Sequence, residues 1–176
     1  MTYTMSKSVI QLRSGRHFDL LNPHPEDVQI EDIAHALSNL CRFTGHCDQF
    51  YSVAQHSLLV SAIVPAEHAL AGLLHDAVEA YIGDISTPLK RTLDSSFVAL
   101  EDLIQCTIAE KFGYVYPFSP EIKEADVVAL STEKRDLMGG WSFHWMGGPE
   151  PSLRAASPSW PRGDYLEFMS RFDQLS

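Results

Sequence analysis

One stretch decides the fold: Leu70-Ala71-Gly72-Leu73-Leu74-His75-Asp76-Ala77-Val78-Glu79-Ala80-Tyr81. It sets three ionisable side chains in a run that is otherwise apolar or small. At helical spacing, His75 and Asp76 lie within one turn of Glu79. Leaving such groups unpaired in a core is costly or shifts their pKa values. A metal ion removes that conflict, because imidazole and carboxylate are common ligands of Zn, Mn, Fe and Co.

Two adjacent ligands do not close a metal site, so we expect the chain to supply another His and another carboxylate. His56 is the best candidate for the second His, because it lies in the first turns of the helix predicted just before the central one. The short link at Val64-Pro65 makes these two helices antiparallel neighbours, so His56 and His75 can face each other.

The missing carboxylate is assigned to Asp126, which interrupts the apolar face of the penultimate predicted helix. Asp102 and Asp136 also lie on predicted helices, and they remain alternatives to Asp126 as the missing carboxylate ligand. The two histidines, Asp76 and Asp126 together make a two-His, two-Asp set. Such a set leaves positions for water and substrate, as a catalytic metal requires.

The length and charge of the chain limit the classes of protein to which it can belong. The 176 residues, 45% of them hydrophobic, predict a single domain over 1–176 with a real core. A net charge of −10 argues against general affinity for a nucleic-acid polymer or an anionic membrane. The three cysteines lack C-x-x-C spacing and favour a reducing compartment. With no signal-peptide pattern and no apolar run of membrane-spanning length, we expect a soluble, cytoplasmic protein.

The spacing of apolar residues and breakers predicts a mostly α-helical bundle with a short N-terminal β-hairpin. Ser52 and Gln55 form a capping-box signature that opens the helix carrying His56. A central helix is expected to run from Pro65 to near Gly83 and to carry the opening stretch. The remaining predicted segments are a hairpin over 8–21, helices over 30–40, 87–93, 94–112 and 120–138, a long loop over 139–163 and a closing helix over 164–176.

The order of the candidate ligands, a His, then a His-Asp pair, then a distant Asp, resembles that of the HD-domain phosphohydrolases. The resemblance covers roughly residues 30–138, and within the family it is similar to bacterial 5'-deoxynucleotidases and small phage dATP triphosphohydrolases. Five segments carry it in the same order: Cys41-Arg42-Phe43, Tyr51-Ser52-Val53-Ala54-Gln55-His56-Ser57, His75-Asp76-Ala77-Val78-Glu79-Ala80-Tyr81-Ile82-Gly83-Asp84, Thr87-Pro88-Leu89-Lys90 and Lys123-Glu124-Ala125-Asp126.

The resemblance implies a helical HD-domain bundle whose metal ligands are His56, His75, Asp76 and Asp126. They would hold one divalent transition metal, Zn, Mn, Co or Fe, and the site could take up an additional Mg²⁺ ion. Glu79 would orient or deprotonate the attacking water, which requires it to lie near the metal without binding it.

The same resemblance implies substrate contacts. Arg42 and Lys90 would neutralise the phosphates, and Asp84 would lie near the sugar or assist the leaving oxygen. Phe43 stands where these relatives usually carry Trp, whose ring packs on the deoxyribose. The departure leaves strict selection for deoxyribose open, although Phe keeps a flat apolar surface.

The function implied by the resemblance is metal-dependent hydrolysis of a 2'-deoxynucleoside 5'-phosphate. A dNTP substrate of the dATP type, releasing nucleoside and tripolyphosphate, is favoured over a dNMP substrate of a 5'-deoxynucleotidase. A nucleotide-sensing module without turnover is the alternative from another class, but Glu79 argues for catalysis because a sensor needs no water-positioning carboxylate. The expected partners are a small-molecule nucleotide and, from exposed aromatic residues near the C-terminus, further copies of the chain in a homo-oligomer.

Overall fold

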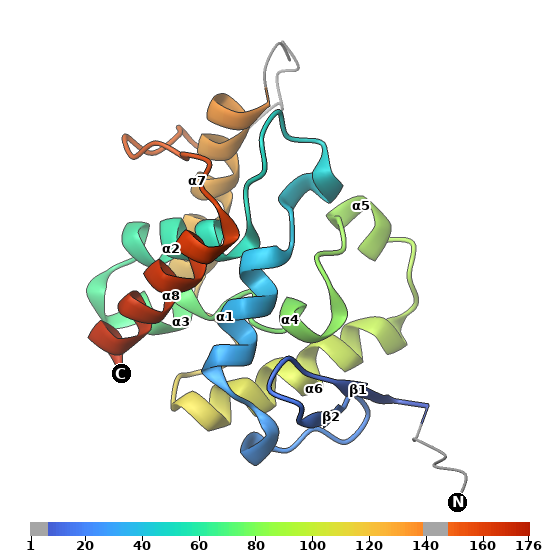
Figure 1. Ribbon diagram of the computed structural model, residues 1–176. Helices are drawn as coiled ribbons and strands as arrows, with labels where there is room; N and C mark the ends of the chain where they lie inside the picture. Colours follow the sequence, from blue (N-terminus) through green and yellow to red (C-terminus); the bar gives the residue numbers. More distant parts are fainter. Residues whose placement is uncertain (1–6, 139–147) are drawn as a thin grey trace, which may run out of the picture.

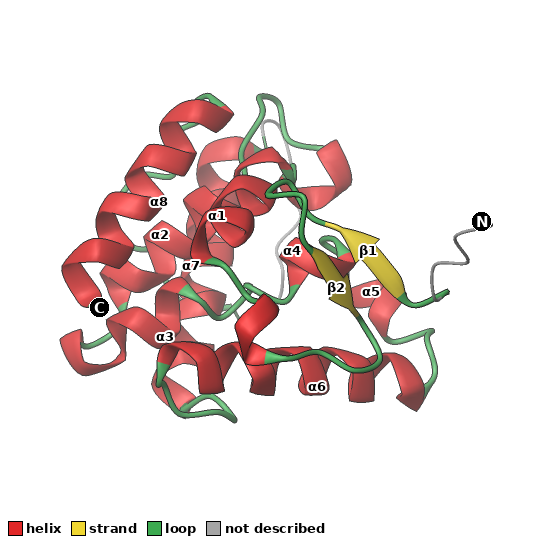
Figure 2. Cartoon of the chain, turned by 60° about the horizontal axis from the view of Figure 1, so that its bottom comes forward, coloured by secondary structure: helices red, strands yellow, loops and turns green. Residues whose placement is uncertain are grey.

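The computed structural model describes residues 7–138 and 148–176, and this part of the chain is mostly helical with one two-stranded sheet (Figures 1 and 2). The predicted fold class is therefore confirmed. The elements in chain order are β1 (Val9–Gln11), β2 (His17–Asp19), η1 (Pro25–Asp27), α1 (Ile30–Asn39), η2 (Arg42–Gly45), α2 (Val53–Ile63), η3 (Ala66–His68), α3 (Ala69–Leu73), α4 (Glu79–Ile82), α5 (Thr87–Lys90), α6 (Ser95–Phe112), α7 (Pro120–Leu137) and α8 (Pro161–Leu175).

The N-terminal hairpin forms as expected and braces the helices beside it. β1 and β2 pair antiparallel with Ile10 opposite Phe18, and the turn between them contains Gly15 at φ 85°. Ser14 in the same turn donates from its backbone N–H and its hydroxyl to Asp32 of α1, at 2.8 and 2.7 Å. The buried Phe18 ring stacks on Tyr81 of α4 with ring centroids 4.0 Å apart. The hairpin thus fixes α1 and α4 relative to each other.

The expected continuous central helix is wrong, because the chain forms two short helices with a turn between them. α3 ends at Leu73 and α4 begins at Glu79, so His75 and Asp76 lie in the break. Around the break, the N–H groups of Ala77 and Glu79 bond to the carbonyls three residues earlier, those of Leu74 and Asp76, at 3.1 and 3.0 Å. The His75 ring donates from Nδ1 to the carbonyl of Gly72 at 2.9 Å, which competes with helix continuation at that oxygen.

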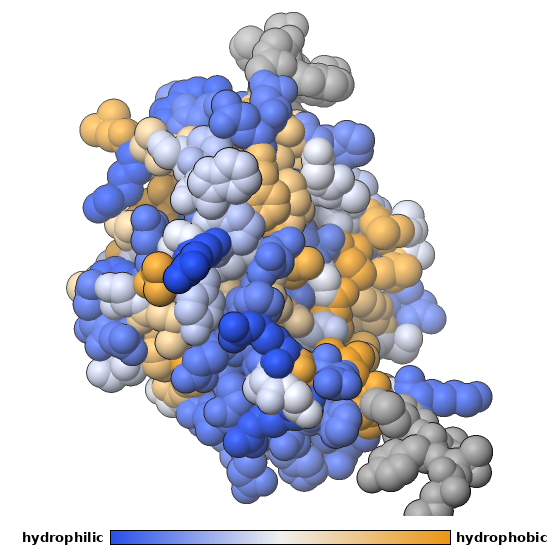
Figure 3. Space-filling view, in the orientation of Figure 1, coloured by the Kyte–Doolittle hydropathy of each residue, from blue (hydrophilic) through white to orange (hydrophobic). Residues whose placement is uncertain are grey.

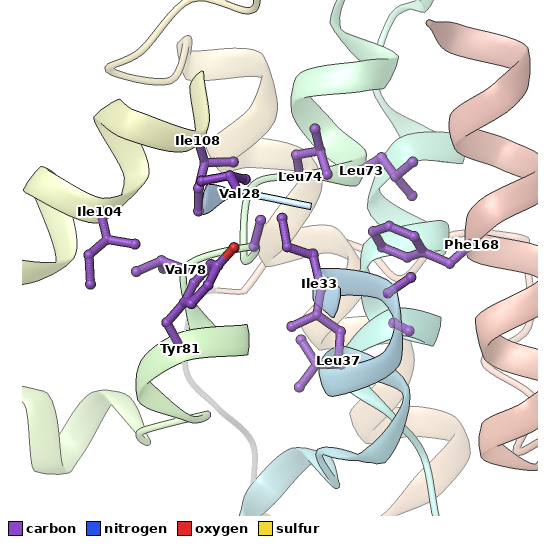
Figure 4. Close-up of a cluster of buried hydrophobic side chains, with 14 of the residues drawn as sticks. Val28, Ile33, Leu37, Leu73, Leu74, Val78, Tyr81, Ile104, Ile108 and Phe168 are labelled. Atoms are coloured by element: carbon purple, nitrogen blue, oxygen red, sulfur yellow. The ribbon is translucent and has the colours of Figure 1, made fainter. Parts of the chain in front are cut away.

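Buried apolar residues on both sides of this break anchor it in the core (Figure 4). Leu73, Leu74 and Val78 belong to the break and its flanks, and each is buried. They pack in one cluster with side chains from three other helices, namely Ile33 and Leu37 of α1, Ile104 and Ile108 of α6 and Phe168 of α8. The position of the His-Asp pair is therefore set by packing against three other helices at once.

The C-terminal part differs from expectation in its boundary. α8 begins at Pro161, three residues before the predicted start, because Pro is favoured in the first helical turn. Of the predicted loop 139–163, residues 139–147, which include Trp141 and Trp145, lie outside the described residues. Trp160 is 83% exposed, and the expected homo-oligomer stays a prediction.

The visible surface is largely hydrophilic, with apolar residues gathered over the region of α5 in the view of Figure 3. Leu89 of α5 and Val98 of α6 are each 50% exposed. None of the described helices has both the length and the apolar character that a membrane crossing requires.

Candidate metal centre

The turn that carries His75 and Asp76 is held open by a side chain from α6. Gln105, which is buried, donates from its amide nitrogen to the Leu74 carbonyl at 2.9 Å. Its amide oxygen accepts from the Val78 N–H at 3.2 Å. One amide thus provides hydrogen-bond partners for two backbone groups that an uninterrupted helix would have paired internally. The helix can therefore break in a buried position without leaving these groups unpaired.

Two helices bring the other predicted ligands to the same point. His56 is fixed in the second turn of α2, whose capping box is formed by Ser52 and Gln55 as predicted. Asp126 lies on α7, which packs against α2. The structure therefore brings together all four predicted ligands from three segments that are far apart in the sequence.

Donor atoms of the four residues converge, with Nε2 of His56 close to each of the other three. His56 Nε2 lies 3.2 Å from His75 Nε2, 3.4 Å from Asp76 Oδ2 and 3.1 Å from Asp126 Oδ1. His75 Nε2 lies 3.2 Å from Asp76 Oδ2 and 3.9 Å from Asp126 Oδ1. Ligands 2.0–2.2 Å from a shared ion are separated by about 3.0 to 3.6 Å in tetrahedral or octahedral geometry. His56, His75 and Asp126 form a group that can hold a metal ion, with Asp76 beside them.

Both histidines present the nitrogen that a metal needs. The Nδ1–H of His75 is directed to a backbone carbonyl, and Nδ1 of His56 lies 2.7 Å from Glu133 Oε1. A carboxylate accepts hydrogen bonds, so Nδ1 of His56 is the donor there. Nε2 of each ring then points to the centre of the cluster, where a metal ion would replace any proton on it and use its lone pair, as in metal-binding histidines.

The electrostatics of the cluster favour a cation. Burial and the Arg42 cation lower the pKa of His56, but Glu133 and Asp126 outweigh them and raise that pKa to about 10. Burial raises the pKa of Asp76, but His75, His56 and Arg42 prevail and hold it well below its usual range. The carboxylates therefore stay ionised and attract positive charge, which a metal ion supplies.

A pocket of about 320 Å³ opens beside the four donors. Its volume falls within the range of small-molecule sites, and its walls carry the convergent polar groups that such sites use. A larger cavity of about 530 Å³, between η3 and the loop after α6, is lined mostly by apolar side chains and by none of the four predicted ligands. The smaller pocket is lined by every predicted catalytic and substrate-binding residue, with Asp76 and Asp126: Arg42, Phe43, Asp76, Glu79, Asp84, Lys90 and Asp126.

Glu79 lies on the wall of this pocket, at the first residue of α4. Its side chain is 5% exposed, and among the described residues its Oε2 has no hydrogen-bond partner. Burial, together with Asp76 and Asp84, raises the pKa of Glu79 well above its usual value. The carboxyl group thus has one free oxygen beside the metal site and an increased affinity for a proton, which suits general acid–base work. Burial also raises the pKa of Asp84.

The predicted phosphate contacts are both anchored by carboxylates. Arg42 donates from Nε to Glu133 Oε2 at 3.1 Å, and its Nη2 lies 3.0 Å from the same oxygen. Lys90 pairs with Glu101 at 2.8 Å and lies 3.9 Å from Glu79 Oε1. These pairs hold two cations on the pocket wall, where the otherwise acidic chain needs them.

Phe43 also lines the pocket, and the chain adopts a special conformation to place it there. Phe43 and Thr44 both have φ 55°, in the left-handed region that non-glycine residues seldom adopt. Such strain persists where surrounding structure fixes it, and it is common at ligand sites. The Arg42 guanidinium lies 5.4 Å from the centroid of the Phe43 ring, within cation–π range.

Sequence reasoning missed Glu133 and Gln105, which support the ligands, and Lys134, which lines the pocket. Glu133 did carry a signal, because it follows Asp126 by seven residues on α7, about two helical turns, and so shares its face. Gln105 carried no signal, since a polar residue on a helix says nothing about a backbone partner 27 and 31 residues away.

Comparison with known proteins places the chain in a family. No family model matches it. It is 43% identical to the uncharacterized protein YfdR of Escherichia coli (strain K12) over 172 residues, which is 96% of each chain. It is also 37% identical to an uncharacterized protein of Rhodobacter capsulatus over 165 residues, covering 85% of this chain and 84% of that one. The chain therefore belongs to the same family as YfdR.

Proposed function

We propose that this protein is an HD-type, metal-dependent phosphohydrolase that cleaves a 2'-deoxynucleoside 5'-phosphate. Its metal ligands would be His56, His75, Asp76 and Asp126. The observation that carries the proposal is the convergence of His56, His75 and Asp126, whose donor atoms lie 3.1 to 3.9 Å apart. Asp76 lies beside the two histidines, and a pocket with cationic walls adjoins the cluster. That arrangement combines metal activation with phosphate binding.

The chemistry divides among the pocket residues. A bound divalent metal would polarise a phosphoryl oxygen and lower the pKa of the attacking water. Glu79 would orient that water through its free Oε2 and accept its proton. Asp84, whose pKa is raised by burial, would lie near the sugar or assist the leaving oxygen.

Substrate binding would depend on the two anchored cations. Arg42 and Lys90 would neutralise phosphate oxygens, since guanidinium and ammonium groups bind phosphate through charge-assisted hydrogen bonds. Phe43 would offer its ring to the sugar. Lys134 adds a third basic side chain to the same pocket wall, which supports a triphosphate over a monophosphate.

A dNTP of the dATP type is thus the favoured substrate, with nucleoside and tripolyphosphate as products. The runner-up is a dNMP, hydrolysed to nucleoside and inorganic phosphate. One observation favours it: the pocket volume of about 320 Å³ lies near the lower end for ligand sites and suits the smaller nucleotide.

Product analysis tests the proposal. The purified protein is incubated with each dNTP, each dNMP and the ribose counterparts in the presence of Mn, Co, Mg or Zn, and products are separated by ion-exchange chromatography. Tripolyphosphate with nucleoside would establish the triphosphohydrolase, and phosphate from monophosphates alone the 5'-nucleotidase. Absence of turnover with every metal would overturn hydrolysis in favour of nucleotide sensing. Asp126→Ala serves as the metal-site control and should remove any activity found.

A further inference from the structure

A fully buried carboxylate, that of Glu133, contacts both a predicted metal ligand and a predicted phosphate-binding residue. Glu133 lies on α7 with no exposed surface. Its Oε1 lies 2.7 Å from Nδ1 of His56, and its Oε2 accepts from Nε of Arg42 at 3.1 Å, with Nη2 of the same guanidinium at 3.0 Å. Burial of a charge is costly unless it is paired and hydrogen-bonded, and Glu133 meets both conditions.

The first contact fixes the protonation of His56. Arg42 can only donate, and an ionised carboxylate can only accept, so Glu133 imposes a proton on Nδ1 of His56. The lone pair is then on Nε2, at the centre of the ligand cluster. The other histidine needs no such partner, because the backbone carbonyl of Gly72 performs the same role for His75.

The second contact fixes Arg42. With Nε and Nη2 engaged by Glu133, the guanidinium plane is set, and Nη1 is 3.8 Å from Asp76 Oδ2 on the side of the metal cluster. Two parallel contacts to one carboxylate oxygen restrict a long side chain that would otherwise lose entropy on binding a ligand.

We propose that Glu133 is a positioning residue that serves both sites at once, setting the tautomer of His56 for metal binding and holding Arg42 in place for a phosphate. The metal half stands on the ligand geometry alone, and the phosphate half rests on the proposed function.

Glu133→Gln separates this role from simple packing, because the two side chains have the same shape. A glutamine amide has one accepting oxygen and one donating nitrogen. If the amide nitrogen faces His56, Nδ1 of His56 must accept the hydrogen bond. The ring proton then moves to Nε2, which no longer has a lone pair with which to bind the metal. If it faces Arg42, two donors meet and the guanidinium loses its anchor.

Zinc affinity is the first measurement, by competition with a chromogenic chelator. Loss of a partner behind a metal-binding histidine weakens metal binding by roughly 10- to 100-fold, and we expect that loss for Glu133→Gln. Glu110→Gln, an exposed site on α6, is the matched control and should bind zinc as the wild type does. Circular dichroism and thermal melting establish that both variants fold. Zinc affinity within twofold of wild type in folded Glu133→Gln, together with phosphate binding equal to that of the wild type, would overturn the proposal, because the amide nitrogen must face either His56 or Arg42.

The tautomer can also be read without a variant. Long-range ¹H–¹⁵N spectra of the zinc-loaded wild type distinguish a protonated Nδ1 from a protonated Nε2. We expect His56 to carry its proton on Nδ1 and to bind zinc through Nε2. A proton on Nε2, or zinc bound through Nδ1, would overturn the proposal even if Glu133→Gln failed to fold.

The phosphate half is tested with inorganic phosphate at saturating zinc, by calorimetry on the wild type, Glu133→Gln and Glu110→Gln. Weaker phosphate binding by Glu133→Gln alone supports the role of Glu133 in holding Arg42, and equal phosphate binding overturns it when zinc affinity is unchanged as well. The inference and the proposed function fail separately. Reduced zinc affinity of Glu133→Gln in a protein that hydrolyses no nucleotide would support the metal half and overturn hydrolysis. Nucleotide hydrolysis by the protein, with the zinc and phosphate affinities of Glu133→Gln unchanged, would support the proposed function and overturn the proposed role of Glu133.

Discussion

At the scale of single residues, two carboxylates three positions apart are placed in opposite electrostatic environments. The pKa of Asp76 is held well below its usual range, because its interactions with His75, His56 and Arg42 outweigh its burial. The pKa of Glu79 is raised by burial and by its acidic neighbours. Environments that separate two carboxyl groups in this way assign them different roles. Asp76 is suited to bind a cation permanently, and Glu79 is suited to exchange a proton.

This division predicts different outcomes for two substitutions. Asp76→Ala should abolish metal retention and activity together, since it removes a ligand. Glu79→Gln should retain the metal but lose about 10²- to 10⁴-fold in kcat, the usual contribution of a general base. Metal content after dialysis, measured by atomic emission, and steady-state kinetics provide the two readouts. Full activity of Glu79→Gln would refute its role, and retention of metal by Asp76→Ala would refute the ligand assignment.

The cluster of candidate ligands could be predicted from the sequence because its members leave local marks. His75 and Asp76 stand out in an apolar run, and Asp126 interrupts an apolar helix face. The supporting residues could not be predicted in the same way. Glu133 contacts residues 77 and 91 positions away, and such pairs are defined only when the helices are packed.

At the scale of secondary structure, the break between α3 and α4 is the feature that sequence periodicity misrepresented. The apolar spacing around His75 fits a helix, and the break depends on Gln105, which the spacing does not reveal. The starts of the helices were predicted more accurately, because a helix cap is formed by residues close together in the sequence. Ser52 caps α2 with Gln55, and Asp94 caps α6.

Replacement of Gln105 tests the origin of the break. Gln105→Leu leaves the Val78 N–H without its side-chain partner, at a cost of about 1–3 kcal/mol, whereas the Leu74 carbonyl keeps its bond from the Ala77 N–H. We expect the free energy of unfolding to fall by about 1–3 kcal/mol in urea denaturation. Glu110→Gln on the same helix should stay within about 0.5 kcal/mol of wild type. An equally small change for Gln105→Leu would show that the core alone imposes the break.

A second element-scale prediction concerns the junction of α2 and α8. Ser52, the N-cap of α2, donates to the buried Asp164 of α8 at 2.6 Å, and burial raises the pKa of Asp164. A pKa above the unfolded value of about 3.9 means that stability from this group is greatest below that pH. It is lost as pH rises through the folded pKa, because the charge must then be buried.

Asp164→Asn keeps an oxygen that can accept from Ser52 and removes the titration. The melting temperature of the variant relative to wild type should therefore rise between pH 4 and pH 7. Asp173→Asn, at an exposed site of α8, is the control and should show no such trend. A pH-independent difference for Asp164→Asn would contradict the assignment.

At the scale of the whole molecule, the metal site joins segments that the chain brings together only on folding. His56 comes from α2, His75 and Asp76 from the break before α4, and Asp126 from α7. An ion bound by all of them binds the folded state in preference to the unfolded one, and so stabilises it.

Metal should accordingly raise the melting temperature. At a free metal concentration 100-fold above Kd, the gain is about 2.7 kcal/mol, or about 5 to 11 °C for a chain of this size. Differential scanning calorimetry with zinc and with a chelator measures it. Asp126→Ala should lose the increase, whereas an equal increase in that variant would place the stabilising ion elsewhere.

The most direct test of the account is the location of the metal in crystals of the zinc-loaded protein, from anomalous diffraction at the zinc edge. We predict a strong peak about 2.0–2.2 Å from Nε2 of His56, Nε2 of His75 and a carboxylate oxygen of each of Asp76 and Asp126. A peak bound by other residues, or none at this point in zinc-saturated crystals, would contradict the metal centre and the function built on it.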